Sequence, residues 1–170
     1  MKMYKRTAKK LSFDSTATRP KKNIKYIVIH YSAGANDTAK NNADYFATTN
    51  TRQAGAHFFV DRDGNIARSV PLKRTAWAVG GFYSKEKGAG TYYNKCTNYN
   101  SVSIELCGVA DKAPSDKQVE AVKKLIVYIK KYCKNADTII RHWDVNGKEC
   151  PKRMIGKSNK EWKSFKKGIS

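Results

Sequence analysis

Short apolar runs alternate along this chain with longer segments in which apolar residues recur every three or four positions. The strongest run, Lys-Tyr-Ile-Val-Ile-His-Tyr-Ser at 25–32, is almost continuously β-prone, which is typical of a strand buried on both faces. Asp63-Gly64 is a hairpin turn signal between two further β-prone runs. The pattern predicts additional strands at 57–61, 65–70, 101–107 and 138–142.

Three segments have the periodicity of helices. Residues 116–132 place apolar side chains on one face with lysines between them, and Ser115 or Asp116 can cap this helix. A second helix is expected over 38–48 with Asp37 as its N-cap, and a closing helix over 161–167. Strands that alternate with helices predict an α/β fold with a central mixed sheet flanked by helices, in which ligands bind at strand ends.

The length of 170 residues suits one domain. Residues 1–22 are polar and basic and are interpreted as a lead-in, with a short strand or turn near 11–13, while 23–170 form the domain itself. Residues 80–100 form a long polar segment with four glycines, and a loop of that length is usually functional or mobile. That segment also carries four tyrosines: Tyr83, Tyr92, Tyr93 and Tyr99.

The chain carries 34 lysines and arginines against 14 acidic residues, a formal net charge of +20. Residues 1–22 hold eight basic residues and one acidic, 112–170 hold sixteen and six, and the middle holds ten and seven. Basic ends favour an acidic polymer as partner, either nucleic acid, an anionic membrane or an anionic cell wall, although solubility alone is an alternative. No apolar stretch approaches the roughly eighteen residues of a membrane span.

The basic start is followed by no apolar segment, so we expect synthesis in the cytoplasm without a secretory signal peptide. Four cysteines are too few for a disulfide scaffold, and none forms a Cys-x-x-Cys pair. Whether Cys96 and Cys107 pair is left open.

Two histidines and one cysteine have positions that suit a metal. His30 and His142 each follow a β-prone run, and Cys150 lies eight residues after His142, directly before Pro151. Two imidazoles and one thiolate make a three-ligand zinc set with an open fourth position, as in catalytic zinc sites. The alternative is two strand-end histidines that bond to backbone and an inert cysteine.

Glu105 and Lys148 are the other candidates for chemistry. Glu105 lies on the same face of its strand as Ser103 and Cys107, where a carboxylate is costly unless it is paired or functional. A solvent-facing edge position is its alternative. Lys148 precedes Cys150 by two residues, so a metal at Cys150 would place this ammonium where it can stabilise an oxyanion.

Together these residues resemble the zinc-dependent N-acetylmuramoyl-L-alanine amidases of the phage-lysozyme and peptidoglycan-recognition-protein superfamily. The resemblance covers about residues 23–155, in the family's order. It rests on five pieces: Ile27-Val-Ile-His30-Tyr-Ser; Gly55-Ala-His57-Phe-Phe-Val-Asp-Arg-Asp-Gly64; Ala76-Trp77-Ala-Val-Gly80; Asn100-Ser-Val-Ser-Ile-Glu105-Leu; and Arg141-His142-x-Asp144 through Gly147-Lys148-x-Cys150-Pro151.

The resemblance implies one Zn²⁺ held by His30, His142 and Cys150, with the metal in a surface groove. It implies Glu105 as general base or water-orienting residue and Lys148 as oxyanion stabiliser. The implied reaction is hydrolysis of the amide between N-acetylmuramic acid and the L-alanine of the peptidoglycan stem peptide, as in an endolysin.

Two positions depart from common family patterns. Ala56 stands where some members have a catalytic tyrosine, which gives Glu105 more weight. Ala78 stands where many members have a histidine, which puts a substrate contact in doubt. Tyr31, His57, Trp77 and the tyrosines of 80–100 are candidate substrate contacts. The alternatives are a structural role for His57, core packing for Trp77 and a plain surface loop for the others.

The resemblance also implies a setting for the protein. Peptidoglycan is the expected partner, together with anionic wall polymers at the basic ends. We expect a monomer, released onto the wall through a membrane hole made by another protein, as phage or prophage lytic enzymes are. The alternatives are a binding module of the same fold that does not cut, and a nucleic-acid-binding protein, although no nucleic-acid motif is recognisable.

Overall fold

A single mixed sheet forms the centre of the protein. The computed structural model describes residues 1–81 and 90–170, so Tyr83 lies outside the described residues. Within them the sheet has the order β1-β4-β3-β5-β2-β6. Its strands are β1 (Tyr4–Lys5), β2 (Tyr26–Tyr31), β3 (Phe58–Val60), β4 (Ile66–Arg68), β5 (Ser101–Leu106) and β6 (Thr138–Arg141).

Four neighbouring strands are parallel. β2 pairs in parallel with β5 and with β6, and β3 pairs in parallel with β5. β4 returns antiparallel to β3 through the predicted hairpin turn at Asp63-Gly64. The register sets His30 opposite Glu105 and Ile29 opposite Arg141. The carboxyl ends of β2, β5 and β6 therefore meet at one edge of the sheet.

Helices cover the sheet as the sequence predicts. α2 (Asp116–Tyr132) has the predicted bounds, and the Ser115 side chain accepts a hydrogen bond from Gln118 N at its start. The cap of α1 (Ala39–Thr48) is Thr38 rather than the expected Asp37, whose carboxylate instead accepts from Gly108 N at 2.7 Å. The remaining helices are α3 (His142–Asn146), α4 (Lys160–Ile169) and 3₁₀ turns at Lys10–Ser12, Lys21–Asn23 and Lys152–Met154.

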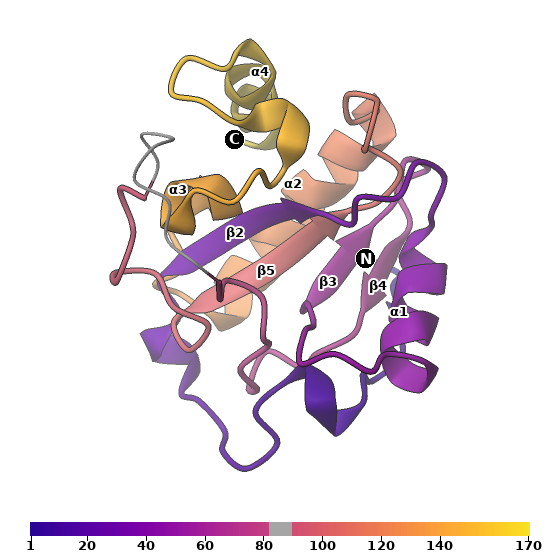
Figure 1. Ribbon diagram of the computed structural model, residues 1–170, viewed down its shortest axis with the longest axis vertical. Helices are drawn as coiled ribbons and strands as arrows, with labels where there is room; N and C mark the ends of the chain where they lie inside the picture. Colours follow the sequence, from indigo (N-terminus) through magenta and orange to yellow (C-terminus); the bar gives the residue numbers. More distant parts are fainter. Residues whose placement is uncertain (82–89) are drawn as a thin grey trace.

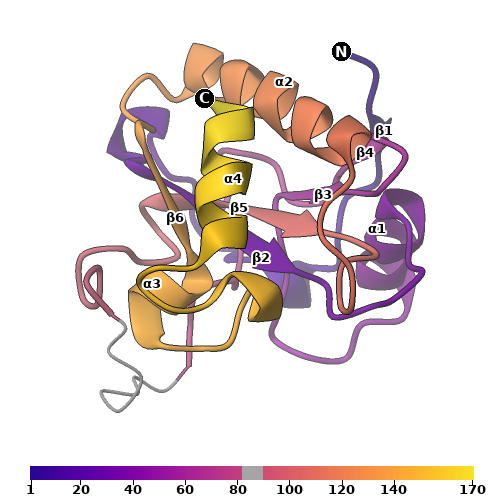
Figure 2. The ribbon, with the colours of Figure 1, turned by 90° about the horizontal axis from the view of Figure 1, so that it is seen from above.

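The core lies mainly between the sheet and two of these helices. α2 lies across one face of the sheet and α4 packs against α2 (Figure 2). Figure 1 shows α1 beside β3 and β4 and α3 at the opposite side. Side chains at alternate strand positions join α2 and α4 in this core, among them Ile27, Ile29, Ile104, Leu125, Ile129 and Phe165. Within the described residues, no helix combines the length and apolar character needed to cross a membrane.

Residues 1–22 pack onto the body of the domain. β1 adds the sixth strand by pairing with β4, and the expected strand or turn near 11–13 is a 3₁₀ turn followed by a bridge from Phe13 to Ala76. Arg19 is only 3% exposed, and burial lowers the pKa of its guanidinium to about 10. That guanidinium donates to four backbone carbonyls: Leu72, Asn98, Tyr99 and Ser101.

Arg19→Met tests this anchor. Methionine fills much of the space but leaves buried carbonyls without donors, so we expect the free energy of unfolding to fall by about 3 kcal/mol. Urea unfolding at pH 7 measures the loss. Arg6→Met is the matched control, because Arg6 is half exposed and only 3.9 Å from Asp44, and should change stability by less than about 1 kcal/mol. Equal losses in the two variants would contradict the anchoring role.

Candidate metal centre and its cavity

The sheet register brings two of the expected residues together. His30 and Glu105 are cross-strand partners near the carboxyl ends of β2 and β5, and both point away from the α2 face. His30 Nδ1 lies 4.0 Å from Glu105 Oε1. His30 is 2% exposed, whereas 19% of the Glu105 side chain is open. Glu105 lies on a central strand, which excludes the solvent-facing edge position considered for it.

His142 and Cys150 come from the turn that follows β6. The expected strand at 138–142 ends one residue early, and His142 is the first residue of α3. Asp144 explains this boundary, because its carboxylate accepts from Arg141 N at 2.8 Å as an N-terminal cap of α3. Gly147 ends α3 with a positive φ of 82°, which favours glycine. Cys150 O then accepts from Trp143 N at 2.9 Å, which fixes the returning chain.

Arg141 holds this turn in place. Its guanidinium forms a buried ion pair with Asp144 at 2.7 Å, and its Nη1 also donates to the carbonyls of Met154 and Gly156. The guanidinium lies 4.6 Å from the Trp143 ring centroid and 5.1 Å from that of Trp162 on α4. Arg141, which directly precedes His142, thus links the turn to α4.

These elements bring His30, His142 and Cys150 into one cluster. One ligand atom from each lies within 4.8 Å of the others. Cys150 Sγ is 3.6 Å from His30 Nδ1, and the two imidazole centroids are 4.7 Å apart. His30 Nε2, Glu105 Oε2 and both ring nitrogens of His142 are buried without a hydrogen-bond partner among the described residues. Buried polar atoms without a hydrogen-bond partner are rare in folded proteins unless a ligand or an ion occupies the site. The cluster could therefore hold a metal ion.

The electrostatics of the cluster also suit a cation. Burial holds the pKa of His30 well below its usual range. Burial and the nearby Lys148 lower the pKa of His142 to about 4. Both imidazoles are therefore neutral at pH 7 and can offer lone pairs, as metal ligation requires. Burial raises the pKa of Glu105 to about 7 against the opposing effect of Lys148, while burial raises the pKa of the Cys150 thiol above its usual range.

The cluster opens into a cavity of about 350 Å³, within the range of ligand sites. Glu105, Lys148, Tyr31 and Trp77 line it, as do His30 and Cys150. A second hollow shares Ala54, Trp77, Ala78 and Lys148 with the first. Its other lining residues are Gln53, Gly80, Gly81 and Asn98. The candidate residues thus lie where two adjoining hollows meet.

The structure does not bring His57 into this cavity, where it was expected to contact substrate. His57 is 1% exposed and lies under the Arg19 anchor, with Arg19 Nη2 2.6 Å from its Nε2. Ser103 N donates to its Nδ1 at 3.1 Å. These contacts favour the structural role for His57.

Other expected residues also lie elsewhere. Tyr92 packs against Tyr26 at 5.7 Å, and Tyr99 Oη accepts from Asn23 Nδ2. The cavity instead uses Asn42 and Tyr45 on α1 and Arg52 after it, none of which the sequence motifs single out. All four cysteines are free thiols, which answers the open question of a Cys96–Cys107 bond.

Comparison with known proteins identifies the family. The model of the family described as N-acetylmuramoyl-L-alanine amidase (Amidase_2) matches residues 20–153. The chain therefore belongs to the Amidase_2 family, as the resemblance implied.

Individual relatives support this assignment. The chain is 28% identical to the N-acetylmuramoyl-L-alanine amidase CwlL of Bacillus licheniformis, with 86% of this chain and 41% of CwlL covered. It is 29% identical to CwlA of Bacillus subtilis (strain 168), with 99% and 57% covered. It thus spans about half the length of these relatives. The structure of the catalytic domain of XlyA is similar, with a TM-score of 0.72, 23% identity and full coverage of both chains.

The buried His57 predicts a pH dependence of stability. Burial and the neighbouring Arg19 hold the pKa of His57 well below its usual range, whereas an unfolded histidine titrates near 6.5. Below about pH 6.5 the unfolded chain therefore takes up a proton that the folded state does not. The free energy of unfolding then falls by up to about 1.4 kcal/mol per pH unit for this histidine.

His57→Gln isolates this contribution. Urea unfolding between pH 7 and 5 should show a slope that is smaller in the variant, by up to about 1.4 kcal/mol per pH unit at the acid end. His30 and His142 contribute in the same direction to both proteins, so the difference in slope reports His57. Identical slopes would contradict the neutral, buried state of this ring.

Proposed function

We propose that this protein is a zinc-dependent peptidoglycan amidase that hydrolyses the bond between N-acetylmuramic acid and the L-alanine of the stem peptide. The observation that carries the proposal is the convergence of His30, His142 and Cys150 in one cluster that opens into a cavity lined by Glu105 and Lys148. Three protein ligands of this kind are typical of catalytic zinc. The family membership and the named amidase activity of the relatives support the choice of substrate.

The residues present fit a zinc ion. Their donor atoms are two neutral imidazoles and one thiol that a metal would deprotonate, and several of these atoms have no other partner. A bound Zn²⁺ supplies a Lewis acid and lowers the pKa of water.

Glu105 and Lys148 carry the acid–base and electrostatic roles in this proposal. With a pKa near 7, Glu105 can accept a proton from the attacking water and return it to the leaving alanine nitrogen. Lys148 lines the same cavity as Glu105 and lies two residues before Cys150, so its ammonium can stabilise negative charge on the carbonyl oxygen. Tyr31 and Trp77 contact the substrate along the cavity wall.

Cys150→Ser and Glu105→Gln separate metal binding from catalysis. We expect about one zinc per chain in the parent and in Glu105→Gln, and less than one-tenth of that in Cys150→Ser. Release of alanine amino groups from purified cell walls should fall at least about 100-fold in both variants. Zinc analysis of the purified proteins and labelling of new amino termini measure the two quantities.

Glu120→Gln is the matched control, because Glu120 lies on the exposed side of α2 next to Lys124 and should leave both quantities unchanged. Zinc binding without new amino termini in the parent would instead favour a wall-binding module that does not cut. Absence of zinc from the parent would contradict the metal centre itself.

In the same proposal, the basic ends of the chain adsorb the enzyme to the cell wall. Residues 112–170 carry sixteen basic and six acidic residues, and the lysines of α2 and α4 are mostly exposed. Phosphate-rich wall polymers would attract such a surface at long range.

Co-sedimentation with walls tests this attraction. The bound fraction should fall several-fold between about 0.05 and 0.5 M NaCl, because the Debye length shrinks over that range. Walls stripped of phosphate polymers should retain less protein at low salt. Retention that neither salt nor stripping alters would contradict adsorption by charge.

A further inference from the structure

The wall of the cavity that α1 supplies has no role in the chemistry described above. Phe46 stacks on Phe59 with ring centroids 5.5 Å apart, and Tyr45 meets Phe46 edge-on at 5.2 Å. Asn42 and Arg52 add polar groups to this apolar wall. Such a wall is suited to a peptide that carries both apolar and anionic groups.

Hydrogen bonds hold the backbone of Arg52 in place, whereas its side chain is available to bind a ligand. The buried side chain of Asn50 accepts from Arg52 N at 3.1 Å and donates to Arg52 O at 2.8 Å. The same amide donates to Ser12 Oγ and to Ala54 O, so the loop is tied to the N-terminal segment. Within the described residues, no hydrogen bond or ion pair engages the guanidinium of Arg52, which is exposed.

Among the described residues, two cations line the cavity, Arg52 and Lys148. Lys148 lies two residues before Cys150 and lines both hollows, whereas Arg52 follows α1 and lines only the first. Arg52 therefore belongs to the α1 side of the cavity and Lys148 to the cluster side. A substrate that spans the cavity meets Lys148 at the reacting bond and Arg52 some way along its chain.

We propose that Arg52 binds a carboxylate of the stem peptide, on the far side of the alanine from the scissile bond, and thereby sets the direction in which the substrate lies. This inference rests on the proposed amidase function. A planar guanidinium can bind a carboxylate through two parallel hydrogen bonds, which gives both affinity and orientation.

Substrate chemistry decides which end of the substrate Arg52 receives. The carboxyl group of N-acetylmuramic acid is consumed in the scissile amide, so the sugar next to that bond carries no anion. The nearest carboxylates belong to the peptide. The peptide therefore lies along α1 toward Arg52, and the sugar lies toward the second hollow, where the described lining residues include Gln53 and Asn98 and no cation other than Lys148.

The test compares two forms of one substrate. Soluble disaccharide–stem-peptide units are released from cell walls with a muramidase, and half are treated with carbodiimide and ammonium to convert their carboxylates to amides. The parent should cleave the carboxylate form with a kcat/KM about tenfold or more above that of the amide form. Arg52→Gln should abolish this preference, mainly through a higher KM for the carboxylate form with kcat nearly unchanged. Arg52→Lys should keep part of it.

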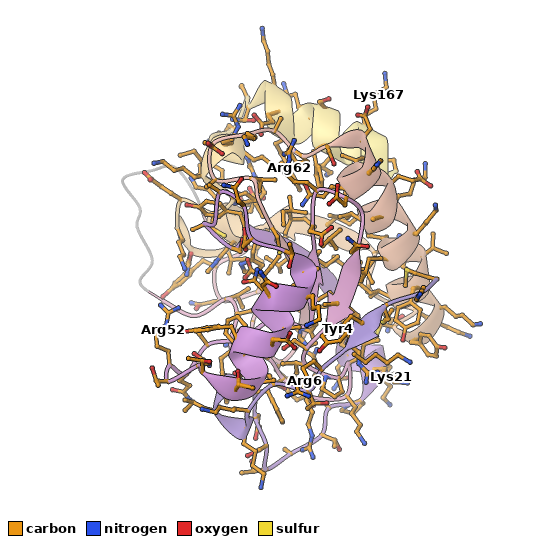
Figure 3. All side chains as sticks on the ribbon, turned by 90° about the vertical axis from the view of Figure 1, so that its right-hand side faces the viewer. Tyr4, Arg6, Lys21, Arg52, Arg62 and Lys167 are labelled. Atoms are coloured by element: carbon orange, nitrogen blue, oxygen red, sulfur yellow. The ribbon has the colours of Figure 1, made fainter. Side chains whose placement is uncertain are left out.

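Arg6→Gln is the matched control, because it removes the same charge from an exposed arginine that does not line the cavity. Figure 3 shows Arg6 and Arg52 at separate places on the α1 side of the molecule. The assays run at about 0.3 M salt to screen long-range attraction.

Four outcomes would overturn the proposal. Equal cleavage of both forms by the parent, or an equal effect of Arg52→Gln on both forms, would remove the role of Arg52 while the amidase function stands. A loss of preference in Arg6→Gln as large as in Arg52→Gln would assign the effect to net charge. Cleavage of neither form by zinc-loaded parent protein would overturn the proposed function and this inference together.

Discussion

The parallel pairing of β2 with β5 and β6 is the constraint on which the rest of the site depends. It places His30 beside Glu105 and brings the end of β6, with His142 next in the chain, to the same edge. A slip of one residue would turn every side chain of a strand to the opposite face. Ile27, Ile29 and Ile104 oppose such a slip, because they fill the core under α2. The hydrophobic face of the sheet thus fixes the position of the polar face.

The turn after β6 positions His142 and Cys150, the two residues of the cluster that do not lie on a strand. A buried guanidinium is costly unless its donors are satisfied, and Arg141 satisfies this condition with Asp144, two backbone carbonyls and two indole rings. Because Trp162 belongs to α4, the position of His142 depends on the C-terminal helix as well. The same core that sets the strand register therefore also supports the turn.

Local signals in the sequence were sufficient for some elements and not for others. The bounds of α2 follow from its periodicity and the Ser115 cap, both of which are local. His142 was placed at the end of a strand, because an Asp144 cap at the third helical position is a weaker signal than the apolar run before it. The role of Arg19 could not be predicted, since its partners lie more than fifty positions along the chain. His57 shows the same limit: a strand-like pattern does not reveal whether a ring faces a cavity or a buried arginine.

Different parts of the chain hold the two sides of the cavity. The cluster side depends on sheet register and on Arg141, whereas the α1 side depends on residues that precede the family match at residue 20. Ser12 O accepts from Trp77 N at 3.2 Å, and its hydroxyl accepts from Asn50. A side chain at Gly55 would come within 2.5 Å of Ser12 O, so glycine allows this close approach. The N-terminal segment therefore acts as a brace for the wall that carries Arg52 and Trp77. Since the cluster and the proposed peptide contacts of the α1 wall are supported by different parts of the chain, that wall can change without moving the residues of the cluster.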